Sequence, residues 1–251
     1  MVGSGNVAWH LAPELENAGH RVSVVYSRNV QNAKALQKRL YNAEVCTGLD
    51  FNECTAEVFV VAVADDAVAG ITKHISLPRE AVLLHTSGSL PISALGYAAS
   101  TACGVLYPLQ TFTKSKRISF EDIPMLIEAE EKQTARILSD IASSISKRVY
   151  QVHYKDRLAI HVAAVFACNF SNKMMTIAQE ILQEQKFDFD MLRPLIAETI
   201  NKSLDIGPKV AQTGPASRGD LETLDRHMDF LQRSPYRELY KEISQKILES
   251  R

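Results

Sequence analysis

The chain opens with MVGSGNVAWH, residues 1–10, and this stretch decides the fold. Gly3, Gly5 and Ala8 follow the pattern G-x-G-x-x-G/A, which joins a strand to a helix in dinucleotide-binding proteins. The first glycine permits a tight turn, the second lets the backbone approach a pyrophosphate, and the alanine lets the helix pack close to the sheet. Two residues precede Gly3, whereas central strands usually run to about five or six. We therefore expect a phosphate-binding turn and a natural chain that begins several residues upstream of Met1.

The rest of the chain has two different patterns. Up to His153, short apolar runs alternate with helical patterns, which is typical of a parallel sheet with crossover helices. Residues 156–185 then form one long helical pattern with neither Gly nor Pro. The predicted fold class is α/β, with a Rossmann-like doubly wound parallel sheet in residues 1–153 and an all-helical domain in residues 154–251. Further helices are predicted over residues 191–203, 220–232 and 236–249.

The composition argues against nucleic-acid-binding, membrane and metal-binding proteins. Lys and Arg number 28 against 29 Asp and Glu, so the net charge is -1, and we expect neither a nucleic-acid nor a membrane partner. The four cysteines are scattered without a C-x-x-C motif, so no metal site is expected. No apolar run of about 18 residues could span a bilayer. We expect a cytoplasmic protein with reduced cysteines.

The end of the second predicted strand, residues 21–28, bears on cofactor choice. An Asp or Glu at this place would accept hydrogen bonds from the ribose hydroxyls of NAD. The sequence instead has Ser27, Arg28 and Asn29. A guanidinium can pair bidentately with a 2′-phosphate and a serine hydroxyl can donate to it, which favours NADP. The alternative is that Arg28 is a solvated side chain at a strand end.

Two further strand ends carry polar residues, at the edge where open α/β sheets bind ligands. Ala64 and Asp65 follow one buried strand, and Asp65 either caps the next helix or contacts the cofactor. The sequence HTSG, residues 85–88, follows another strand and is either an ordinary turn or part of the site. We include Ser87 and Gly88 among the predicted cofactor contacts.

The helical half offers candidates for substrate binding. His161 and Asn172 are eleven residues apart, which at about 100° per residue places them on one face of a regular helix. Asn169 is flanked by apolar residues, and a buried amide would need partners. Arg218 lies in a Gly- and Pro-containing loop where it could hold an anion. His161 and Arg218 could also have ordinary structural roles.

Five motifs give the sequence a resemblance to a known family. VGSGNVA, LHTSG, YPLQTF, HVAAVFACNF and TGPASRGDLETLDRH resemble a bacterial family of NADP-dependent oxidoreductases with a Rossmann-like domain and a C-terminal helical domain of unknown function. The resemblance covers essentially the whole chain. It implies an architecture similar to pyrroline-5-carboxylate reductase, ketopantoate reductase, prephenate dehydrogenase and 6-phosphogluconate dehydrogenase, whose helical domain supplies substrate contacts and much of a dimer interface. It also implies that NADP is bound by Gly3, Ser4, Gly5, Asn6, Val7, Ser27 and Arg28.

These observations predict an enzyme that transfers a hydride between NADP(H) and a small carbonyl, imine or alcohol compound that bears a carboxylate. His161 or His85 would carry the proton, because imidazole titrates near neutral pH. Asn169 would orient the substrate and Arg218 would hold its carboxylate. The long apolar helix predicts a homodimer. The alternatives are a non-catalytic NADP-binding sensor and a structural dimer that has lost its cofactor.

Overall fold

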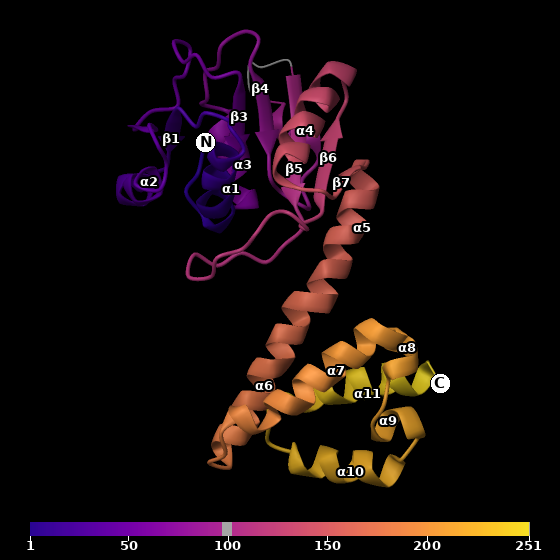
Figure 1. Ribbon diagram of the computed structural model, residues 1–251. Helices are drawn as coiled ribbons and strands as arrows, with labels where there is room; N and C mark the ends of the chain where they lie inside the picture. The colour runs from indigo at the N-terminus through magenta and orange to yellow at the C-terminus, as the bar shows by residue number, and fades with distance from the viewer. Residues whose placement is uncertain (97–101, 251) are drawn as a thin grey trace. The chain divides into compact units, whose positions relative to one another are not determined.

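The computed structural model describes residues 1–96 and 102–250 (Figure 1). The chain divides into two compact units, Met1–Val165 and Phe166–Arg251. The domain boundary expected from the sequence, after residue 153, lies directly before α5 (Tyr154–Ala164), a helix of the first unit. This boundary stays a prediction.

The first unit is built on a β-sheet with Val2 near its middle. Val2 bridges Tyr26 on one side and Val61 on the other, so it takes the place of a central strand between β1 and β3. Its N–H donates to the carbonyl of Val60 at 2.8 Å, and its carbonyl accepts from the N–H of Ala62 at 2.8 Å. The strands are β1 (Val24–Tyr26), β2 (Glu44–Cys46), β3 (Val58–Val61), β4 (Val82–His85), β5 (Ala102–Pro108), β6 (Met125–Ala129) and β7 (Val149–Gln151).

The strand directions follow the connections between them. β1 pairs with β2, and β3, β4 and β5 pair in that order, all in parallel. β6 is antiparallel to β5, with Gly104 opposite Ala129, and β7 is parallel to β6. Parallel neighbours need a crossover, usually a helix, whereas residues 109–124 between β5 and β6 form a loop without one. The sheet is therefore parallel as predicted up to β5, and then reverses.

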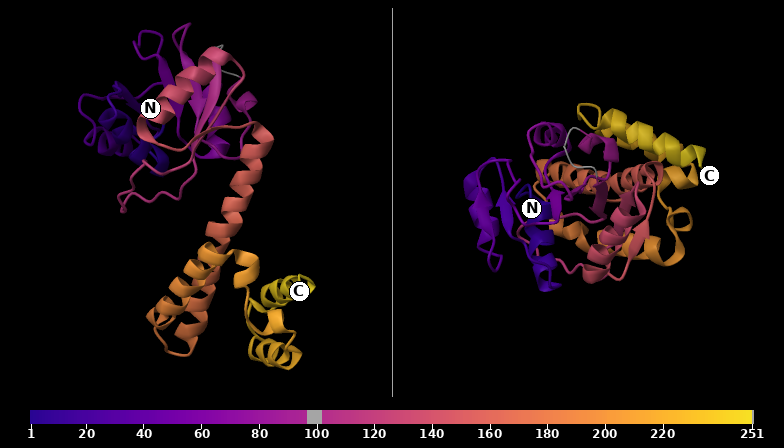
Figure 2. Two further views of the ribbon diagram at one scale, coloured as in Figure 1. Left: turned by 45° about the vertical axis from the view of Figure 1, so that its right-hand side comes forward. Right: turned by 90° about the horizontal axis from the view of Figure 1, so that it is seen from above.

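Helices cover both faces of the sheet, as expected for a doubly wound fold (Figures 1 and 2). Leu84 of β4 packs in one core cluster with side chains of α1 and α4, and its neighbour Leu83 packs in a second cluster with α3 and η1. Successive strand residues point to opposite faces, so a short apolar run supplies both clusters. The helices of this unit are α1 (Asn6–Asn17), α2 (Val30–Gln37), α3 (Asp65–Thr72), η1 (Ile92–Leu95), α4 (Lys132–Ile145) and α5.

The second unit is helical, as predicted. The expected long helix is present as α5, a π-helical segment η2 (Val165–Phe170) and α6 (Ser171–Glu184) in direct succession. Hydrogen bonds in a π-helix span five residues, so the spacing of 100° per residue does not hold between residues 161 and 172. The remaining elements are η3 (Phe189–Leu192), α7 (Arg193–Ile206), α8 (Pro208–Ala211), α9 (Pro215–Arg218), α10 (Leu221–Phe230) and α11 (Arg237–Glu249). Within the described residues, no helix is long and apolar enough to cross a membrane.

Candidate cofactor and active site

The glycine turn has the backbone that a phosphate-binding turn requires. Gly3 adopts a φ of 119°, and a Cβ atom there would lie 2.2 Å from the carbonyl oxygen of Ala62. Gly5 has space around it, because its nearest neighbour would be 3.9 Å from a Cβ. Ala8 is fully buried where α1 approaches the sheet. Gly3 therefore permits the tight turn and Ala8 the close packing that the pattern predicts, and the approach of a pyrophosphate to Gly5 stays a prediction.

A cleft of about 980 Å³ begins at this turn. Ser4 and Ser27 both line it, and the Ser4 hydroxyl donates to the Ser27 hydroxyl at 2.8 Å. Exposed backbone N–H groups at the start of α1 are the groups that bind phosphates in other proteins, so the cleft fits a dinucleotide. Of the predicted cofactor contacts, those that line the cleft are Gly3, Ser4, Gly5, Asn6, Val7, Ser27, Arg28 and Ala64.

The wall formed by α2 carries polar residues beyond those predicted. Asn29 caps α2 by accepting hydrogen bonds from the N–H groups of Gln31 and Asn32. Asn32 lines the cleft beside Arg28, and Lys114 lines it from the loop between β5 and β6. The sequence reasoning missed Lys114, because its proximity to the glycine turn depends on the path of that loop.

Asp65 joins the cleft to the turn after β4. Its neighbours Ala64 and Asp66 line the cleft, while its carboxylate accepts hydrogen bonds from Ser87 Oγ at 2.9 Å and from Ser89 Oγ. The N-cap position of α3 is Ala64, and no side chain caps the helix. The carboxylate of Asp65 therefore fixes a turn instead of capping its helix. Ser87 and Asp65 bind each other, and their contact with the cofactor stays a prediction.

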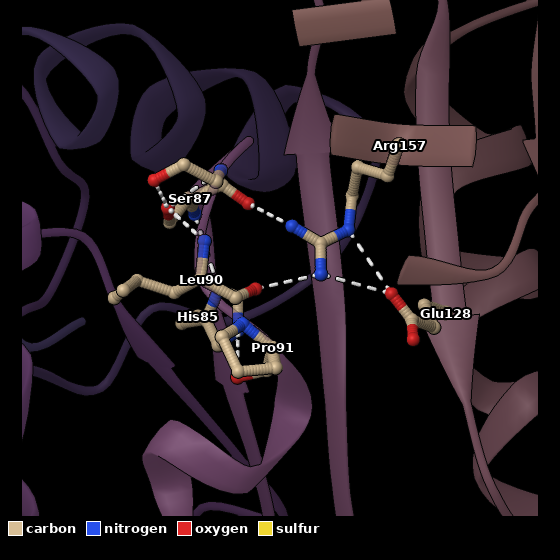
Figure 3. A network of polar contacts seen from close by, with 7 residues as sticks. His85, Ser87, Leu90, Pro91, Glu128 and Arg157 are labelled. Atoms are coloured by element: carbon tan, nitrogen blue, oxygen red, sulfur yellow. Dashed lines mark hydrogen bonds and ion pairs between the residues drawn. The ribbon is translucent and has the colours of Figure 1, made fainter. Parts of the chain in front are cut away.

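His85 is fully buried and both ring nitrogens are engaged (Figure 3). Nδ1 accepts from the N–H of Ser87 at 3.1 Å, so Nε2 carries the proton, which points to the Pro91 carbonyl at 3.3 Å. Burial, together with the charge of Arg157, lowers the pKa of His85 from 6.5 to about 4. The ring is therefore neutral at physiological pH and shapes the turn.

Arg157 of α5 is a buried cation with a hydrogen-bond partner for each of its three nitrogens (Figure 3). Its Nη1 donates to the Ser87 carbonyl at 2.8 Å and its Nη2 to the Leu90 carbonyl at 2.7 Å. Nε and Nη2 also donate to Glu128 Oε2 at 3.1 and 2.9 Å. The guanidinium thereby links the turn after β4, strand β6 and the first turn of α5. The sequence reasoning missed Arg157. The one feature that could have indicated it is its position four residues before His161, on the same face of the helix.

A second histidine meets this turn at Gly88. A Cβ atom on Gly88 would lie 2.5 Å from His161 Nδ1 and 2.8 Å from Tyr107 Cζ, so only glycine fits. The Tyr107 hydroxyl and His161 Nδ1 are 3.0 Å apart. Burial raises the pKa of Tyr107, which keeps the phenol protonated at neutral pH. Tyr107 and His161 therefore pair against Gly88, in the turn whose Ser87 and Leu90 carbonyls bind Arg157.

The other two candidates, Asn169 and Arg218, belong to the second unit. Both side chains are exposed, and Asn169 lies in the π-helical segment. The burial expected for Asn169 was wrong, because neighbouring Phe166 and Phe170 are also largely exposed. Their substrate roles stay predictions. The part of the chain that the structure covers contains no cluster of His, Cys, Asp or Glu able to hold a metal ion.

Comparisons with known proteins place this geometry in a family. Residues 1–87 match the family "NADP oxidoreductase coenzyme F420-dependent", and residues 123–247 match the domain of unknown function DUF2520. The structure of an inferred NADP oxidoreductase from Bacteroides fragilis is 38% identical, with 99% of this chain and 96% of that chain covered and a TM-score of 0.89. The chain belongs to this family of NADP oxidoreductases. No curated protein matches it.

Two more distant structures share the fold. A reductive aminase from Aspergillus terreus, in complex with NADPH and ethyl levulinate, is 12% identical over 98% of this chain and 92% of its own, with a TM-score of 0.69. Prephenate dehydrogenase from Aquifex aeolicus, in complex with hydroxyphenyl propionate and NAD+, is 13% identical over 99% and 96%, with a TM-score of 0.59. The predicted fold, enzyme class and NADP cofactor are confirmed.

Proposed function

We propose that this oxidoreductase uses NADPH to reduce a small carbonyl or imine compound that bears a carboxylate, or runs the reverse oxidation, and that His161 carries the proton. The observation behind the proposal is the Tyr107–His161 pair, held against Gly88 at the carboxyl end of β4. Open α/β sheets bind their ligands at this edge. The phosphate-binding turn lies at the same edge.

The cofactor would be held along the cleft. The backbone from Gly3 to Val7 would bind the pyrophosphate at the start of α1, and Ser27 and Arg28 would bind the 2′-phosphate. When bound, NADPH supplies the hydride. Gly88 would let the turn lie close to His161 and Tyr107, and the hydrogen bonds that Ser87 and Ser89 donate to Asp65 would keep that turn in place.

The protein's own task is to manage one proton. His161 Nδ1 faces Tyr107, and within the described residues Nε2 has no hydrogen-bond partner. In the imidazolium form, Nδ1–H donates to the phenol oxygen and Nε2–H is free to reach a substrate atom. Loss of the Nε2 proton would leave a neutral ring whose Nδ1–H still donates to the Tyr107 oxygen. His85 is the weaker candidate, because both of its nitrogens are engaged and its pKa is about 4.

The substrate would take its remaining contacts from the helical unit. Asn169 would orient the reacting carbonyl or imine, and Arg218 would pair with the carboxylate. Both side chains are exposed, and in the described chain no carboxylate lies within ion-pair distance of Arg218. An arginine can pair bidentately with a carboxylate, which supports this substrate class.

We also propose a cytoplasmic homodimer formed by the helical unit. Its buried apolar residues are few, while Leu195 of α7 is 63% exposed and Leu204 is 79% exposed. Exposed apolar surface of this extent is typical of an interface. Among the described residues no disulfide joins any of the four cysteines, which supports a reducing compartment.

A substrate panel with NADPH tests the function. Keto acids, cyclic imines, and ketones mixed with amines are supplied in turn, and NADPH consumption is followed by absorbance. With an active compound, His161→Gln should lower kcat by roughly 10²–10⁴-fold while NADPH affinity stays the same. Tyr107→Phe should lower kcat less and shift the pH profile.

A matched control is available in the helical unit. His227 Nδ1 is 2.7 Å from the Tyr240 hydroxyl, so His227→Gln removes a histidine–tyrosine pair of the same chemistry. This variant should keep wild-type turnover. Full activity in His161→Gln would overturn the proton assignment, and failure of every compound with bound NADPH would count against the proposed substrate class.

A further inference from the structure

The loop between β5 and β6, residues 109–124, is attached to the helix that follows the glycine turn. His10 of α1 donates through Nε2 to the carbonyl of Thr113 at 2.9 Å. The Phe112 ring stacks between His10, with centroids 5.4 Å apart, and Phe120, with centroids 5.6 Å apart. In Figure 1 the loop passes below α1, at the edge of the sheet where the strands end. Two independent contacts therefore fix the residues that follow Phe112.

This attachment brings Lys114 to the cofactor cleft. Lys114 lines the cleft together with Ser27 and Arg28, although it comes from a different part of the chain. Its Nζ lies 4.9 Å from the centroid of the Trp9 ring, and the Arg39 guanidinium lies 4.5 Å from the same centroid. The indole thus supports a lysine that otherwise extends from an exposed loop.

Positive charge gathers around this part of the cleft. In the described chain no acidic partner forms an ion pair with Arg28, Arg39, Lys114 or Arg117. Burial, and after it the charge of nearby Arg117, lowers the pKa of Arg39. The whole chain has a net charge of only -1, so the gathering is local. Asp66, in the first turn of α3, is the acidic residue in the cleft lining.

Resting on the cofactor placement proposed above, we propose that Lys114 is a second basic contact for the 2′-phosphate of NADP, acting together with Arg28. Of the four unpaired cations only these two line the cleft, so they alone can reach a bound ligand directly. A dianionic phosphate accommodates two cations without leaving either unneutralised, and an ammonium on a flexible stem can follow it. NAD has no such phosphate, so the loop would contribute to cofactor choice as well as affinity.

The test is calorimetric titration of the full-length protein with NADPH and, separately, with NADH. Lys114→Ala should weaken NADPH binding about tenfold and leave NADH binding unchanged. Lys116→Ala removes the same charge two residues away, on a side chain outside the cleft lining, and should change neither affinity. Lys114→Arg should restore most of the NADPH affinity.

Each other outcome overturns the assignment. Equal weakening of NADPH and NADH would place Lys114 at the pyrophosphate, and unchanged NADPH binding would remove it from the site. If Lys116→Ala weakened NADPH binding as much as Lys114→Ala does, the loss would reflect general electrostatic attraction and not a contact made by Lys114. A thermal melt of each variant separates a lost contact from a loop that has come away from α1.

Discussion

The two units of the chain bury apolar surface very differently. In the first unit, Leu11, Leu84 and Leu106 are fully buried in one core cluster, and Leu83 is fully buried in a second cluster on the other face of the sheet. In the second unit, Leu204 and Val210 are 79% and 73% exposed. Its buried apolar residues within the described chain are only Ile177, Ala211, Ala216, Leu224 and Leu231. The first unit therefore completes its own core, whereas the second needs further surface, which we propose a second copy supplies.

Polar residues show the same contrast. The first unit buries a whole guanidinium, Arg157, and satisfies it with a carboxylate and two carbonyls. The substrate candidates of the second unit, Asn169 and Arg218, are exposed. The residues proposed for cofactor binding and proton transfer thus lie within the first unit, and those proposed to choose the substrate lie in the second.

The largest expected effect is on the buried ion pair. Arg157→Met leaves Glu128 and the carbonyls of Ser87 and Leu90 without their donor, and should lower the free energy of unfolding by about 3–5 kcal/mol. Lys147→Met breaks the exposed pair with Glu121 and should leave the urea midpoint unchanged. Equal midpoints for the two variants would show that the buried network is not what holds the turn.

His85 should make stability depend on pH. Its pKa is about 4 in the folded protein and 6.5 in the unfolded chain, so between these values the unfolded state binds the extra proton. The neutral ring's contribution is present above about pH 6.5 and is lost as the pH falls, by about 3 kcal/mol near pH 4. Urea unfolding measured from pH 7 to pH 4 should show this decline, and His85→Asn should flatten it. An equal slope in both proteins would assign the pH dependence to other groups.

The exposed apolar face of α7 should control association. Leu204→Asp places a charge where the side chain is 79% exposed and should weaken the dimer by about 2 kcal/mol or more. Lys34→Asp changes an exposed charge on α2 of the first unit and should leave association as it is. Analytical ultracentrifugation measures both. A wild-type protein that stays monomeric at micromolar concentration contradicts the proposed interface.

The smallest effect is expected at the turn after β4. Asp65→Ala removes the acceptor for Ser87 and Ser89 and should cost about 1 kcal/mol more than Asp66→Ala. Both aspartates lie in the first turn of α3, so their interaction with the helix dipole is similar and the difference reports the two hydrogen bonds. Thermal melts should rank the variants in this order, and equal melting temperatures would contradict it.

The sequence predicts what depends on neighbouring residues. Gly3, Gly5 and Ala8 act within one turn, and the hydrophobic periodicity of a helix extends over about a dozen residues. Both patterns can therefore be recognised in the sequence. The partners of Arg157 lie 29 to 70 residues away, and no local pattern indicates them. The reversal at β6 and the position of Lys114 depend on the path of one loop. Asn169 was expected to be buried because its neighbours are apolar, but those neighbours are themselves exposed in the single chain.

The central claim, a self-sufficient cofactor unit joined to a unit completed by a second copy, is tested most directly by amide hydrogen exchange of the full-length protein. The exchange is measured at a high and a low protein concentration, each with and without NADPH. We predict that NADPH protects residues 3–7 and 27–32 at both concentrations, while dilution speeds exchange in α7 and leaves β3 to β5 unchanged. Exchange in α7 that is indifferent to dilution, or NADPH protection that spares the glycine turn, would contradict the account.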